Sequence, residues 1–298
     1  MEALTRQEVL QFLCSLGIEL PPATKLPDSA LNERLDQAIK SCEELVSERA
    51  LHKLKLSSLR DWPSGRLKVA PAMMRLNVEE FSRQSIFNTE LRDRALQLLS
   101  CLRHILIGFA DNWDKGSKAF FIDDPDNLQT LHIALRVCHS SPLHYRILNV
   151  LPQIIEIKKI DDNTPALVVV YSTFTQDDSK LANEWDDENG KLSGKLPTYV
   201  KLTLIQQKAV LRILEVNSKY VPDNFRPHTT PLEAKFKTSV ILPFGPLSFE
   251  ALGKLNIDTG CMICGGKMAK KCAQCHSVGY CSSGKFSTFF TSHDAPFS

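Results

Sequence analysis

The order of apolar and polar positions predicts two helices at the start of the chain. Thr5 and Glu8 have the spacing of a capping box, and the apolar residues after them run to Gly17, which supplies the end of a short first helix. A second helix is expected from Asp28, because apolar residues recur there at every third or fourth position. Its apolar stripe consists of Leu31, Leu35, Ala38, Ile39, Cys42, Leu45 and Val46.

An irregular stretch separates these helices from the next helical pattern. Residues 58–87 contain Pro and Gly and show no sustained period, so we expect an irregular connection there. Helical spacing returns after Thr89 and continues to Gly108. The first 110 residues are therefore expected to be mostly helical.

The middle of the chain has the pattern of strands. Three short segments are rich in Val, Ile and Leu and are bounded by Pro, Asp or Asn, which favours strands. These segments are residues 131–137, 154–160 and 166–171, and together they predict a small sheet. Residues 175–197 are polar and longer than a usual connection, so we expect a mobile loop there.

The pattern after this loop predicts a helix, a strand and another helix. Thr203 and Gln206 have capping-box spacing, and the helix that they begin is expected to stop before Pro222. Residues 237–242 predict one more strand. Residues 249–255 predict a short helix that leads into a group of cysteines.

Composition limits the choice of partners and compartment. The formal net charge of +2 comes from 36 basic and 34 acidic residues, which gives no overall field that would attract nucleic acid or an anionic membrane. No apolar run approaches the roughly 18 residues of a membrane span, and the first six residues do not have the pattern of a signal peptide. We therefore expect an intracellular protein of the cytoplasm or nucleus, without a membrane partner.

Five of the nine cysteines lie close together near the C-terminal end, as Cys261, Cys264, Cys272, Cys275 and Cys281. In a reducing compartment, clustered cysteines are more often metal ligands than disulfide partners. A Cys-x2-Cys turn presents two thiolates to one ion, and two such turns make zinc the default metal. The seven residues between the two turns form a much shorter loop than the roughly 15 to 20 of a simple four-cysteine finger. The first pair is therefore expected to take further ligands from downstream.

The downstream candidate is Cys281, which follows Tyr280, and this arrangement resembles the MYND-type zinc finger. The resemblance implies two zinc ions held in cross-braced fashion. Cys261, Cys264 and Cys281 would serve the first Zn²⁺, and Cys272 and Cys275 the second. It also implies a protein partner, in particular a short proline-containing peptide. The residues between the last predicted strand and the cysteines resemble the approach to the finger in uncharacterised MYND proteins of fungi.

The sequence departs from the family pattern after Ser283. Lys285 stands where the sixth ligand is expected, and Phe297 stands where the last cysteine is expected. A lysine ammonium has no lone pair to donate to a metal, so the first site has three sulfurs. His293 has the spacing of the family's histidine, but the Gln and Trp expected near it are missing. A retained intron after Ser283 is one hypothesis for the loss of the pattern.

Nucleic-acid binding and enzymatic activity are the two alternatives to protein binding. A nucleic-acid interface rests only on Lys267, Lys270 and Lys271, and the charge of zinc-bound thiolates offsets most of their local basicity. An enzyme would need catalytic signatures, yet the sequence contains no nucleophile elbow, zinc-protease motif or dinucleotide fingerprint. An open catalytic zinc would also need a general base beside it, and none accompanies the cysteines. An unrecognised enzyme domain remains an alternative.

Together these observations predict a non-enzymatic zinc protein with an α+β fold. Its N-terminal part is expected to be mostly helical, with a small sheet in the middle and a small zinc-dependent finger at the C-terminal end. The expected division is a body at residues 1–250 and a partial MYND-type finger at residues 251–298.

Overall fold

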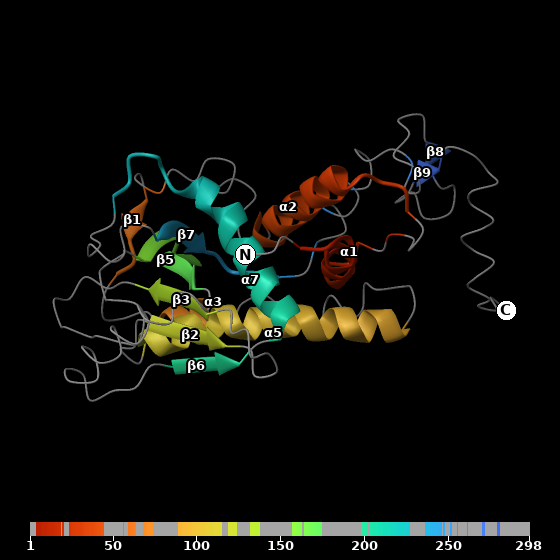
Figure 1. Ribbon diagram of the computed structural model, residues 1–298. Helices are drawn as coiled ribbons and strands as arrows, with labels where there is room; N and C mark the ends of the chain where they lie inside the picture. The colour runs from red at the N-terminus through yellow and green to blue at the C-terminus, as the bar shows by residue number, and fades with distance from the viewer. Residues whose placement is uncertain are drawn as a thin grey trace. The chain divides into compact units, whose positions relative to one another are not determined.

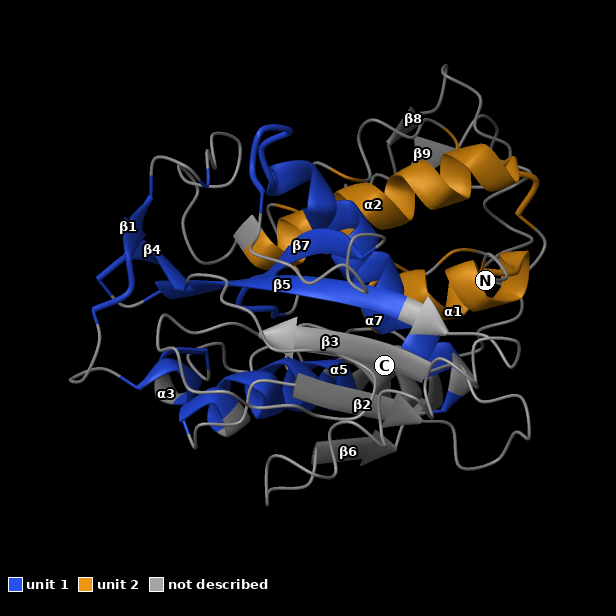
Figure 2. Cartoon of the chain, turned by 60° about the vertical axis from the view of Figure 1, so that its left-hand side comes forward, with its two compact units in different colours: residues 1–3, 46–77, 100–245 blue, residues 4–45, 78–99, 246–298 orange. Residues whose placement is uncertain are grey.

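The computed structural model has an α+β fold, with helices and a mainly antiparallel sheet (Figure 1). Its described residues form two compact units, shown in different colours in Figure 2. Unit 1 comprises residues 1–3, 46–77 and 100–245, and unit 2 comprises residues 4–45, 78–99 and 246–298. The predicted boundary at residue 250 stays a prediction. The structure describes residues 4–18, 20, 24–44, 56, 59–63, 68–73, 89–114, 119–123, 132–137, 157–162, 164–174, 198–201, 203–226, 236–245, 247, 251, 255, 261, 270–271 and 279–280.

Both ends of the first helix follow the prediction. Helix α1 (Arg6–Ser15) begins with a capping box, in which the Thr5 amide donates to the Glu8 carboxylate at 2.8 Å and the Glu8 amide donates to Thr5 Oγ1 at 3.3 Å. Gly17 has a φ of 89°, a conformation that other residues rarely adopt, and it ends the helix. Local hydrogen-bonding chemistry therefore fixes both ends of α1.

Helix α2 (Asp28–Glu44) also begins where the pattern predicts and is buried along the predicted stripe. Its last two predicted members, Leu45 and Val46, lie outside the described residues. Helices α1 and α2 contact one another, so each covers part of the apolar stripe of the other. The stripe residues of α2 that are fully buried are Leu31, Leu35, Ala38, Ile39 and Cys42.

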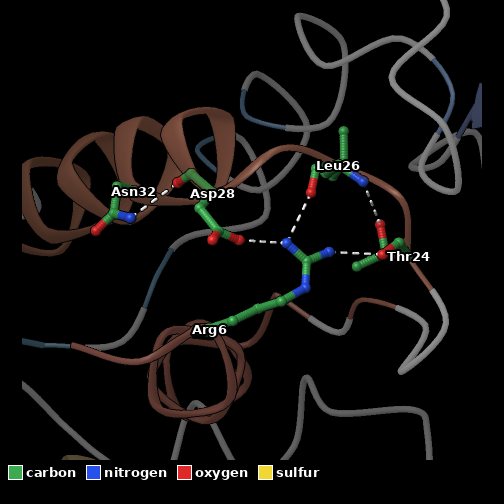
Figure 3. A network of polar contacts seen from close by, with 5 residues as sticks. All are labelled: Arg6, Thr24, Leu26, Asp28 and Asn32. Carbon is green, nitrogen blue, oxygen red and sulfur yellow. Dashed lines mark hydrogen bonds and ion pairs between the residues drawn. The ribbon is translucent and has the colours of Figure 1, made fainter.

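An arginine of α1 holds the segment that leads into α2 (Figure 3). The Arg6 guanidinium donates to the carbonyl oxygens of Thr24 at 2.6 Å and Leu26 at 2.8 Å, and it also pairs with the Asp28 carboxylate. One turn further on, the Asn32 side chain donates to the Asp28 carbonyl at 2.8 Å. The planar fork of the guanidinium suits several acceptors at once, so one side chain positions the start of the second helix.

The sheet of unit 1 has seven strands in the described part of the chain. The order is β1-β4-β5-β3-β2-β6, and β7 also pairs with β5. Only β2 and β6 pair in parallel; the other pairs are antiparallel. The strands are β1 (Arg60–Asp61), β2 (Ala119–Asp123), β3 (His132–Val137), β4 (Ile157–Asp161), β5 (Thr164–Phe174), β6 (Thr198–Lys201) and β7 (Lys237–Ile241).

The sheet confirms the four predicted strands and adds three that the sequence pattern did not indicate. Strands β3, β4, β5 and β7 correspond to the predicted ones, whereas β1, β2 and β6 were missed. The prediction of an irregular connection at residues 58–87 was wrong in part, because β1 and the short helix α3 (Val69–Met73) lie within it. The loop predicted at residues 175–197 lies outside the described residues. Of the short helix predicted at residues 249–255, only Ala251 and Leu255 are described, and both are helical.

Helix α5 (Thr89–Asp114) begins at the predicted residue but does not end at Gly108. A glycine inside a helix costs only about 1 kcal/mol relative to alanine, and the buried side chains of Phe109 and Trp113 continue the apolar face beyond it. The Asp114 carboxylate then accepts hydrogen bonds from two amides at the start of α3, at 3.0 and 2.9 Å. Burial therefore carries α5 beyond Gly108, and the last residue of α5 caps the start of α3.

The core of unit 1 surrounds β5, which pairs with β7 along one edge and with β3 and β4 along the other. Residues 166–170 of β5 are buried to 1% exposure or less, so both faces of the strand are covered. One face packs in an apolar cluster with Leu56, Val240 and Leu242. A strand with two buried faces is expected to consist of consecutive apolar residues, and β5 has such a run at residues 166–170.

Helix α7 (Leu204–Asn217) and the 3-10 turn η4 (Ser218–Tyr220) lie against β7. The buried Ser239 hydroxyl donates to the Leu214 carbonyl at 2.6 Å, and the fully buried Asn217 amide donates to the Val240 carbonyl at 2.9 Å. The second bond satisfies a backbone group of β7, which pairs with β5 on its other side. The polar residues at the end of α7 therefore complete the hydrogen bonding of this strand.

Candidate metal centre

One of the five predicted zinc ligands lies within the described residues. Cys261 is fully buried, which is compatible with a ligand enclosed by protein but is also common for a cysteine that only packs. The other four predicted ligands are Cys264, Cys272, Cys275 and Cys281, and they lie outside the described residues. The structure therefore neither assembles nor separates the predicted set.

A small antiparallel strand pair lies between the predicted ligands in the sequence. Strand β8 (Lys270–Lys271) pairs with β9 (Gly279–Tyr280), with Lys270 opposite Tyr280 and Lys271 opposite Gly279. Cys272 is the next residue after β8, and Cys281 is the next residue after β9. Two-residue strands are too short to show a period of two, so hydrophobic patterning could not reveal this pair.

Strands β8 and β9 run in opposite directions. Because β8 and β9 are antiparallel, the chain leaves β8 at one end of the pair and leaves β9 at the opposite end. The connection between them, residues 272–278, contains Cys272 and Cys275. Cys281 follows the other end, which is also the end at which the chain enters β8.

The donor set suits zinc better than a hard cation. Thiolates are soft ligands that zinc binds at about 2.3 Å, whereas magnesium and calcium prefer oxygen. The described residues contain no group of three or more His, Cys, Asp and Glu side chains placed to hold a metal ion. Cys264, Cys272, Cys275 and Cys281 lie outside these residues, so the predicted zinc site stays a prediction.

Cys42 and Cys101, two further cysteines of the described region, do not have the properties of reactive thiols. Burial raises the pKa of Cys42 well above its ordinary value, and the charge of neighbouring Glu43 raises it further. Burial also raises the pKa of Cys101. A raised pKa keeps the thiol protonated, and the thiolate is the form that attacks or binds metal. Cys42 and Cys101 are therefore packing residues.

A buried tyrosine of β5 is a polar feature that the sequence pattern did not indicate. Tyr171 is 2% exposed, and its hydroxyl has no hydrogen-bond partner among the described residues. Burial, with a smaller contribution from the charge of Glu215, raises its pKa above the ordinary tyrosine value. Glu215 pairs at 3.9 Å with both Arg212 and Lys237. Because the phenol stays neutral around pH 7, it is not a general base.

Comparison with known proteins gives no family for this chain. No family model, curated protein or solved structure matches it. Among the helices that the structure describes, none is long and apolar enough to cross a membrane.

Proposed function

We propose that this chain is a non-enzymatic zinc protein whose C-terminal segment is a MYND-type protein-interaction module carried by the α+β body. The module's ligands are Cys261, Cys264, Cys272, Cys275 and Cys281. The observation that carries the proposal is the spacing of these five cysteines, with two Cys-x2-Cys turns and a fifth cysteine after Tyr280. The zinc is structural, and the surface that it stabilises receives a proline-containing peptide of a partner protein.

One feature of the described residues supports this proposal. Residues 270–271, at the end of the segment between the two Cys-x2-Cys turns, pair with residues 279–280, which directly precede Cys281. An isolated two-stranded pair is at best marginally stable in water, and two residues per strand is shorter than the usual minimum. Zinc binding can supply the missing free energy, as it does in small metal-dependent domains.

The first experiment measures zinc in the purified full-length chain. We expect zinc in the native protein and a loss of at least half of it in Cys264→Ser. Cys101→Ser is the matched control, because it removes a thiol from α5 and should leave the zinc content unchanged. A native chain that contains no zinc after purification without chelators, and takes up none on addition of Zn²⁺, contradicts the proposal.

The second experiment tests the partner class. The zinc-loaded full chain is applied to an array of proline-containing peptides and to duplex DNA over a range of salt concentrations. We expect zinc-dependent retention on a subset of the peptides and little retention on DNA at physiological salt. Zinc-dependent retention on DNA that falls steeply with salt, without peptide binding, would replace the protein partner with nucleic acid.

A further inference from the structure

We infer that the hairpin of helices α1 and α2 packs against residues 247–261, and that the two segments form one cooperative unit that unfolds separately from unit 1. About 200 residues separate them in the sequence. The hairpin is then the base that carries the C-terminal segment, rather than a part of the body. This inference involves no metal, so it can hold or fail independently of the proposed function.

The first step is the division of the chain into two compact units. Helices α1 and α2, shown in orange in Figure 2, belong to unit 2, and residues 246–298 belong to the same unit. Residues 46–77 and 100–245, which make up most of the chain between them, belong to unit 1. The hairpin is therefore grouped with the C-terminal segment and not with the sheet.

The second step is the width of the buried side of α2. Its edges are Arg34 and Glu43, which are 2% and 1% exposed. At about 100° per residue these two positions lie half a turn apart around the helix axis, with the apolar stripe between them. A helix that faces a core on one side only needs a stripe of roughly 100°. Helix α1 contacts α2 but has only 10 residues, so α2 requires a second neighbour.

The third step is the burial of the segment that leads to the cysteines. Leu247 and Cys261 are fully buried, and Leu255 is 7% exposed. A segment this short cannot enclose its own apolar side chains, so they must pack against another surface of unit 2. The wide buried side of α2 is a surface of the same unit that needs a neighbour. The hairpin and residues 247–261 therefore complement one another.

Mutual burial makes the two segments cooperative. If each covers the apolar side chains of the other, neither keeps its amides protected from hydrogen exchange once the other opens. Unit 1 has its own core around β5, so its amides should stay protected when unit 2 opens. Hydrogen exchange followed by mass spectrometry on the full-length chain therefore separates the two units.

The first test compares Leu35→Ala with Gln37→Ala. Leu35 is fully buried near the middle of the buried side of α2, whereas Gln37 is exposed on the same helix. Leu35→Ala should raise the exchange rates of α2 and of residues 247–261 together, by about tenfold or more, and leave β5 unchanged. Gln37→Ala should change none of them. Faster exchange in α2 alone would assign its second neighbour to residues 89–99 of α5, which also belong to unit 2, and would overturn the inference.

The reciprocal test is Leu255→Ala. It should raise the exchange rates of α2 as well as those of residues 247–261, because the loss of either partner opens the same unit. A rise confined to residues 247–261 contradicts the inference, and so does a rise of equal size in β5. Native exchange at residues 247–261 as fast as in an unfolded peptide also contradicts it. Zinc is measured in the same native sample: its absence contradicts the proposed function and leaves this inference intact.

Discussion

Strand β5 and the cysteine-bearing segment, residues 261–281, differ in the apolar side chains that their sequences supply. Residues 166–170 are all apolar and almost fully buried, so the strand gains its stability from the removal of apolar surface from water. The segment at residues 261–281 contains five cysteines and four lysines or histidines but few large apolar side chains. In the proposed zinc module, metal binding would offset the entropy lost on folding of this segment. We therefore expect the cysteine-bearing segment to respond to zinc removal and β5 to respond to truncation of a buried apolar side chain.

The largest expected effect comes from zinc removal. Chelation should remove hydrogen-exchange protection from the amides of β8 and β9, because structural zinc sites supply apparent binding free energies of about 10 kcal/mol or more. The amides of β5 should keep their protection, since apolar burial in unit 1 holds them. Hydrogen exchange followed by mass spectrometry measures both regions in one sample. Equal loss of protection in β5 would break the comparison.

The converse perturbation is Leu167→Ala in β5. Leu167 is fully buried, and its truncation should lower the free energy of unfolding of unit 1 by about 3 kcal/mol through lost burial and a cavity. Zinc content should not change. Leu59→Ala is the control, because Leu59 is only partly buried at the margin of the apolar cluster and should cost about 1 kcal/mol. Urea denaturation measures both losses, and a loss of zinc in Leu167→Ala would contradict separate stabilisation.

A buried hydrogen bond should cost less than buried apolar volume. Asn217→Ala removes the donor to the Val240 carbonyl, and the loss of a buried partner typically costs about 2 kcal/mol. Ser218→Ala is the neighbouring control: its hydroxyl donates to the Glu215 carbonyl at a partly buried site, so we expect a loss of under about 1 kcal/mol. Urea denaturation compares the two variants. Equal losses would show that Asn217 is not what completes the hydrogen bonding of β7.

The helices show how far local sequence signals determine the fold. The capping boxes at Thr5 and Thr203 both correctly mark helix starts, since a cap depends on residues three positions apart. Strands β2 and β6 were missed for the opposite reason. They are four or five residues long, and their parallel pairing joins segments that are distant in the sequence. The local sequence of a short strand does not indicate which distant strand it pairs with.

The candidate site shows a similar limit. The spacing of the cysteines is a local signal, and the zinc ligands that it predicts stay a prediction. The β8–β9 pair could not, because two residues per strand carry no alternation. The buried hydroxyl of Tyr171 was also not predicted. The apolar neighbours of Tyr171 in β5 predict that the segment is buried, but they do not indicate whether the hydroxyl forms a hydrogen bond. Whether a buried polar group forms a hydrogen bond depends on tertiary packing.

The Tyr171 hydroxyl gives a prediction of opposite sign to the substitutions in β5 and α7. Tyr171→Phe should raise the free energy of unfolding by about 1 kcal/mol, because it removes a buried polar atom that lacks a partner among the described residues. Tyr220→Phe is the control, since Tyr220 is only partly buried and should change stability little. Urea denaturation at pH 7 measures both. A destabilised Tyr171→Phe would mean that the hydroxyl makes a stabilising bond.

The pH dependence of the same variant follows from the raised pKa of Tyr171. Above about pH 10 the unfolded chain loses the phenolic proton while the folded chain keeps it. The unfolded state then binds fewer protons, so the native protein loses up to about 1.4 kcal/mol per pH unit from this group. Phenylalanine has no such proton, so the advantage of Tyr171→Phe should grow as pH rises past 10. A constant advantage between pH 7 and 11 would contradict the raised pKa.

The smallest expected effects compare two glycines that the sequence pattern treats alike. Gly17 has a φ of 89° and ends α1, whereas Gly108 lies inside α5 with open space where a Cβ would stand. Gly108→Ala should therefore raise the free energy of unfolding by about 0.5 to 1 kcal/mol, because alanine loses less backbone entropy in a helix. Gly17→Ala should lower it by about 1 kcal/mol, because a side chain strains that backbone conformation. Thermal unfolding of the two variants measures both signs. Stabilisation by both substitutions would mean that Gly17 does not need its left-handed conformation to end α1.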